Sequence, residues 1–163
     1  MKGTVTLGET YAASLDQTCA KIFWALNAVK GNIVVGADAS NAFAEAPAPC
    51  APLYMKLDSP FHTWWKSLGR APIPDGYGVK VHKALQGHPE SPRLWATLIN
   101  KIIVDLGFKP CHHEPCLYVS TNYQGEIVYF LRQVDDFAVS APTKSIAEHV
   151  ISAINSKMTI QIK

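Results

Sequence analysis

Two adjacent aspartates, Asp135 and Asp136, interrupt an otherwise apolar stretch near the C-terminal end of the chain. Residues 126–133 before them and residues 137–140 after them are rich in β-branched and aromatic side chains, which favour strands. Carboxylates are costly to bury within such a sheet, whereas a tight turn leaves them in water. The pattern therefore predicts a β-hairpin that carries both acids in its turn.

A third carboxylate, Asp38, ends another strand-like run, residues 32–38. If this strand neighbours the hairpin, the three acids meet at one edge of the sheet. Clustered carboxylates repel one another unless a cation lies between them, and Mg²⁺ prefers carboxylate oxygens, water and phosphates as ligands. Two such ions, roughly 3.5–4 Å apart, activate a hydroxyl nucleophile and stabilise the leaving group in phosphoryl transfer.

Each acid also has a simpler interpretation. An Asp-Asp pair in a turn is often only a solvated turn, and a single Asp after a strand often forms an Asx-turn or a helix cap. Neither signal is specific by itself, so the surrounding residues decide between these interpretations.

The rest of the chain alternates between helical and strand-like patterns. A helix is predicted from about residue 15 to residue 30 with Ser14 as its cap, a second opens at Ser91-Pro92, and a third follows Thr143. Further strands are predicted at residues 53–57, 79–83, 117–121 and 158–162, with an irregular excursion at residues 58–78. This order predicts one α+β domain over residues 1–163, an antiparallel sheet with helices packed on one face.

Composition excludes several classes of protein. Hydrophobic residues make up 48% of the 163 residues and charged residues 17%, which is typical of a globular chain and not of a disordered one. The sequence contains no run of about 18 apolar residues that would predict a membrane span, and its first residues do not form a secretory signal. We therefore expect an intracellular protein. The net charge of +2 is low for a nucleic-acid-binding protein.

Six short motifs follow one another along the chain. They are ETYA at residues 9–12, DASNAF at 38–43, LYM at 53–55, KALQGHPESPRLW at 83–95, EPCLY at 114–118 and QVDD at 133–136. In this order they resemble the reverse transcriptase domain of Ty1/copia-type retrotransposons, and the resemblance covers nearly the whole chain. It implies a polymerase palm, the domain that carries the catalytic carboxylates.

The resemblance implies an RNA-directed DNA polymerase, a nucleotidyltransferase that uses two Mg²⁺ or Mn²⁺ ions. Asp38 and Asp135 would be the metal-binding carboxylates, and Asp136 would be the third acid, near the primer terminus. The implied partners are an RNA or DNA template with its primer, deoxynucleoside triphosphates, and the rest of the retrotransposon polyprotein. The implied location is a cytoplasmic virus-like particle or the nucleus, between which the sequence does not distinguish.

Three further residues acquire roles from the resemblance. Phe43 would lie under the sugar of the incoming nucleotide, where its ring would clash with a 2′-hydroxyl and favour deoxynucleotides. Gln86 would line the nucleotide pocket, and Gly87 would allow a close approach of the backbone. Trp95 is interpreted as a core residue on a helix.

The chain also departs from the family. Gln133 replaces the usual Tyr at the primer end, and Pro89-Glu90 replaces the usual Lys-Gln. The fingers of the family would precede Met1, and its thumb and RNase H domain would follow Lys163. A truncated or decayed copy that keeps the palm fold without activity, at most a nucleic-acid-binding module, is therefore the alternative.

Two other functions, a nuclease and a zinc site, are alternatives to the polymerase. A two-metal nuclease could use the same three acids but offers no account of Phe43 or Gln86. The segment from Cys111 to Cys116 contains zinc-type ligands, but their spacing fits no standard structural zinc site.

Overall fold

The computed structural model describes residues 10–74 and 76–158. Its main element is a five-stranded antiparallel sheet of order β1-β7-β6-β5-β4. In that order the strands are β1 (Ile33–Asp38), β7 (Asp136–Ala141), β6 (Glu126–Gln133), β5 (Leu117–Tyr123) and β4 (Lys109–Pro110). The α+β class predicted from the sequence is confirmed at this level.

Helices α4 (Ser91–Asp105) and α5 (Lys144–Asn155) cover one face of the sheet and enclose the main core. The sheet contributes alternate residues of β6 and β7 to this core, including the fully buried Phe130 and Val139. The helices contribute Trp95, Ile99 and Val150, which are also fully buried. Alternation along the strands thus places one apolar set of side chains on the α4–α5 face.

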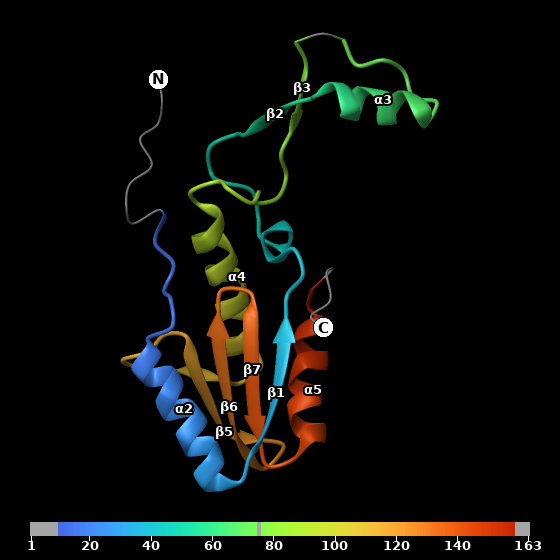
Figure 1. Cartoon of the computed structure of the whole chain (residues 1–163). Coiled ribbons are helices and arrows are strands. Elements are labelled where there is room, and N and C mark those ends of the chain that lie inside the picture. Colours follow the sequence, from blue (N-terminus) through green and yellow to red (C-terminus); the bar gives the residue numbers. More distant parts are fainter. Residues whose placement is uncertain (1–9, 75, 159–163) are drawn as a thin grey trace.

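Helix α2 (Gln17–Lys30) lies on the opposite face, in front of the sheet in Figure 1. Its buried Asn27 accepts a hydrogen bond from the hydroxyl of Ser140, whose neighbours Val139 and Ala141 point to the other face. The Lys30 ammonium lies 5.7 Å from the ring centroid of Tyr129 on that same face. The prediction that helices pack on one face only is therefore wrong, because this side of the sheet also carries residues that a helix covers.

The start of α2 differs from expectation. Asp16, not Ser14, caps the helix: its carboxylate accepts hydrogen bonds from the backbone N–H groups of Cys19 and Thr18, and these hydrogen bonds lower the pKa of Asp16. Two residues of α2 are buried, the apolar Phe23 and the polar Asn27, whereas the apolar Val29 is 87% exposed. Asn27 is hydrogen-bonded to the sheet, so apolar spacing alone does not mark the whole inner face of this helix.

The other helix boundaries are closer to the prediction. Thr143 caps α5, as expected, by accepting the backbone N–H of Ile146 at 3.4 Å. Helix α4 begins at Ser91, but the Ser91 hydroxyl donates to the carbonyl of Leu85 at 2.6 Å and does not cap the helix. The strand expected at residues 158–162 lies outside the described residues, except for Met158.

An arm extends beyond the end of the sheet at which the β6–β7 turn lies (Figure 1). It contains the two-stranded sheet of β2 (Tyr54–Lys56) and β3 (Gly78–Lys80) and the helix α3 (Ser59–Ser67). The irregular excursion predicted at residues 58–78 is thus partly helical. Asp58 caps α3 through the Phe61 N–H at 2.9 Å, and Pro60 occupies the first turn, where its missing N–H costs nothing.

Arg132 is a buried charge within the main core. Its side chain is 3% exposed, and its Nε atom has no hydrogen-bond partner. Its Nη2 atom donates a weak hydrogen bond to Cys116 Sγ at 3.7 Å, and the guanidinium also lies within hydrogen-bonding reach of Tyr118. A buried donor without an acceptor costs free energy that an apolar side chain of similar length avoids.

We therefore expect Arg132→Met to raise the free energy of unfolding by about 1–3 kcal/mol. Urea denaturation at constant m-value measures this change. Lys101→Met on the exposed side of α4 is the matched control and should change stability by less than about 0.5 kcal/mol. A loss of stability in Arg132→Met would show that the contacts of the guanidinium outweigh its burial.

Candidate functional site

The strand register brings the three predicted carboxylates to one end of the sheet. Asp38, the last residue of β1, pairs directly with Asp136, the first residue of β7. Asp136 also pairs with Gln133, the last residue of β6, so the hairpin turn consists of Val134 and Asp135 alone. Directly opposed residues in an antiparallel pair point to the same face, so Asp38 and Asp136 share a face.

Two hydrogen bonds hold the carbonyl groups of the β6–β7 turn. The backbone N–H of Ala39 donates to the Asp135 carbonyl at 2.9 Å. The indole Nε1–H of Trp95, in the first half of α4, donates to the Val134 carbonyl at 2.8 Å. From the sequence, Trp95 was predicted only as a core residue. A buried indole N–H needs an acceptor, and this need was the available signal that Trp95 also makes a hydrogen bond.

The carboxylates themselves are exposed and close to water. The side chains of Asp38, Asp135 and Asp136 are all exposed. The Ser40 hydroxyl donates a long hydrogen bond to Asp38 Oδ2 at 3.5 Å. Among the residues that the structure describes, no three His, Cys, Asp or Glu side chains converge on a common metal position. The strand register therefore brings the acids to one end of the sheet without joining all three side chains in one group. Carboxylate oxygens of this kind are suitable ligands for Mg²⁺ or Mn²⁺.

Phe43 follows β1 in the short 3₁₀ helix η1 (Ala42–Glu45). Its ring is half-buried and packs against the main core. Asn41 precedes η1 with a φ of 57°, a left-handed conformation that Asn tolerates better than most residues. This turn carries the chain from Asp38 to Phe43 at the acidic end of the sheet.

The loop that contains Gln86 and Gly87 lies beside η1. Ala84 N–H donates to the Ala46 carbonyl at 3.1 Å, and Lys83 Nζ donates to the Glu45 carbonyl at 2.9 Å. Gln86 and Gly87 themselves are exposed. Gly87 has a φ of 86°, a backbone conformation that favours glycine. A Cβ there would meet no atom within 4 Å, so the backbone conformation and not a close neighbour explains the glycine.

A groove adjoins Asp136 on the α2 face of the sheet. This cavity of about 250 Å³ lies between the first half of α2 and the ends of β6 and β7. Trp24 and Leu131 form apolar parts of its wall, and Gln133 and Asp136 form the polar part.

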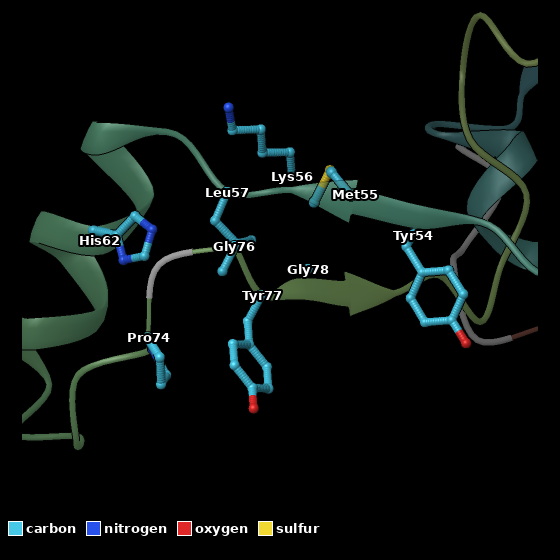
Figure 2. A pocket seen from close by; sticks show the side chains of 9 residues that line it. All are labelled: Tyr54, Met55, Lys56, Leu57, His62, Pro74, Gly76, Tyr77 and Gly78. Atoms are coloured by element: carbon cyan, nitrogen blue, oxygen red, sulfur yellow. The ribbon is translucent and has the colours of Figure 1, made fainter.

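A second, larger cavity, of about 330 Å³, lies in the arm and away from the acids. Figure 2 shows that β2, α3, β3 and the segment between α3 and β3 supply its walls. Its polar side chains include Lys56 and His62. The three acids Asp38, Asp135 and Asp136 are not among the described residues that line it.

The cysteine-rich segment contributes to structure. Cys116 is buried, and burial raises the pKa of its thiol. Glu114 accepts the backbone N–H groups of Cys116 at 2.8 Å and Asp16 at 2.9 Å, which ties this segment to the start of α2. Within residues 10–74 and 76–158 it forms no group of three metal ligands.

No protein-family model and no curated protein matches this chain. In the described part of the chain, no helix is both long enough and apolar enough to cross a lipid bilayer.

Proposed function

We propose that this chain is the palm region of a Ty1/copia-type reverse transcriptase, an RNA-directed DNA polymerase within a retrotransposon polyprotein. The observation that carries the proposal is the pairing of Asp38 with Asp136, next to a two-residue turn that contains Asp135. Three carboxylates from two distant parts of the chain thus meet at one end of an antiparallel sheet. The six ordered motifs support the same assignment.

In this proposal Asp38, Asp135 and Asp136 hold two Mg²⁺ or Mn²⁺ ions. When bound, the ions supply activation of the primer 3′-hydroxyl and stabilisation of the leaving pyrophosphate. The exposure of the three side chains supports this role, since ligands, primer and triphosphate must reach them from solvent. A rigid sheet end also limits the reorganisation that the reaction requires.

The neighbouring segments would bind the nucleotide and the template–primer. Phe43 lies on η1, which follows Asp38 along the chain. The loop with Gln86 and Gly87 is bonded to the end of η1, because the Ala84 N–H donates to the Ala46 carbonyl. This contact between the two segments supports a shared role in which Phe43 contacts the sugar and Gln86 lines the nucleotide pocket. The groove next to Asp136, with its exposed wall residue Gln133, is the proposed path of the primer end.

Primer extension on an RNA template tests the proposal. The purified chain, with Mg²⁺ or Mn²⁺ and deoxynucleoside triphosphates, is expected to extend a labelled primer. Asp135→Asn should abolish this extension, because it removes one charge of the metal ligands without changing side-chain size. Gel separation of the products measures both results.

An inactive palm remains the second candidate, and Gln133 is the observation that favours it. Gln133 pairs with Asp136 where the family carries a Tyr that supports the primer end. Extension by neither the wild-type chain nor its Gln133→Tyr variant would establish this candidate. Extension restored by Gln133→Tyr would instead show an intact site that lacks one primer contact.

A further inference from the structure

The turn that carries Asp135 is strained. Val134 has a φ of 56°, a left-handed conformation that is rare for a β-branched residue. The first position of a two-residue hairpin turn of this kind usually belongs to Gly. Val134 is also 40% exposed, so burial of its own side chain gives the turn little compensation. Other contacts must therefore hold this backbone in place.

Trp95 supplies the contact from the body of the protein. Its side chain is fully buried within the core formed by α4 and the sheet, and its Nε1–H reaches the Val134 carbonyl at 2.8 Å. That carbonyl belongs to the peptide group that joins Val134 to Asp135. A fixed orientation of this peptide sets the direction in which the Asp135 side chain leaves the backbone.

We infer that Trp95 is a positioning residue for the acidic turn: through one indole N–H it holds the Val134–Asp135 peptide and so aims the Asp135 carboxylate at the metal site. This inference rests on the proposed function. The backbone N–H of Ala39, the residue that follows β1, bonds the next carbonyl, that of Asp135, so two successive peptide groups are held from two different parts of the chain. The helix thereby controls the geometry of a carboxylate that it does not touch.

Removal of the N–H alone tests the inference. Trp95 is replaced in the full chain by the unnatural amino acid 3-benzothienylalanine, in which sulfur takes the place of the indole N–H while the ring keeps its size. Trp95→Phe is the second variant and uses natural amino acids only. Ile99→Val is the matched control, since Ile99 is fully buried one turn further along the same helix and makes no bond to the turn.

Two measurements are made on each protein: the NMR order parameters of the backbone amides of residues 134–136, and the affinity for Mn²⁺ from water-proton relaxation. The order parameters should fall from about 0.85 in the wild type to below about 0.6 in both Trp95 variants. The Mn²⁺ affinity should fall by about 10- to 100-fold. Ile99→Val should change neither quantity.

The outcomes separate the inference from the proposed function. Unchanged order parameters in the benzothienyl variant would overturn the inference, as would a looser turn with unchanged Mn²⁺ affinity. If the wild type binds no Mn²⁺, or if the Asp135→Asn variant binds it equally well, the proposed metal chemistry fails instead. The order parameters then still decide whether Trp95 holds the turn.

Discussion

Asp38→Asn is expected to lower primer extension by about 100- to 1,000-fold, because it removes a charge that a metal-dependent transfer requires. The same change should stabilise the metal-free protein. Asp38 and Asp136 are directly opposed in the β1–β7 pair, and like charges in that arrangement are destabilising by about 0.2–1 kcal/mol. A gain in stability together with a loss of activity is the pattern expected of a functional carboxylate pair.

Calorimetry in the presence of a chelator and gel-based primer extension measure the two effects. Mg²⁺ should raise the melting temperature of the wild type and have a smaller effect on the variant, since a ligand stabilises only the state that binds it. Glu126→Gln is the matched control: it removes one negative charge at the start of β6, away from the turn, and should alter neither quantity. Wild-type extension by Asp38→Asn would exclude Asp38 from the site.

Phe130→Ala is expected to lower the free energy of unfolding by about 3–5 kcal/mol. Phe130 is fully buried at the centre of an aromatic cluster, with ring centroids 5.4 Å from Phe137, 6.1 Å from Tyr118 and 6.2 Å from Phe108. Its removal leaves a cavity that joins β5, β6, β7 and the end of α4. Such aromatic pairs add about 0.5–1.5 kcal/mol each beyond the burial of their area.

Urea denaturation measures this loss, with Ile127→Ala as the control. Ile127 lies on the same strand but on the other face and is 43% exposed, so its truncation should cost less than about 1 kcal/mol. Equal losses in the two variants would show that the stability of β6 depends on strand pairing and not on the core that it covers. The proposed catalytic turn follows this strand directly, so the result also shows how much the core contributes to the stability of the strand that carries the turn.

Local patterns predicted the elements that carry the site. The alternation on both sides of Asp135-Asp136 predicted the β6–β7 hairpin, and the apolar run before Asp38 predicted β1. These signals depend on residues two to four positions apart, which the sequence displays directly. Thr143 was recognised as a cap for the same reason, since the backbone N–H that it accepts lies only three residues further along the chain.

Longer contacts required the tertiary structure. From the sequence, contact between β1 and the hairpin was only a condition for gathering the acids. The strand register meets this condition by pairing Asp38 with Asp136, 98 residues further along the chain. The Asn27–Ser140 hydrogen bond joins α2 to the second face of the sheet, and a search for apolar stripes does not detect a polar contact of this kind.

The amino-acid sequence by itself determined which residues are available for chemistry and which segments carry them: one carboxylate after an apolar strand, and two between apolar strands. Only the tertiary structure decided how they are held. The bond from Trp95 to Val134 joins residues 39 positions apart through a backbone carbonyl, which every residue possesses and no sequence pattern marks. The orientation of the turn therefore depends on packing between a helix and a sheet, and packing is a property of the folded molecule.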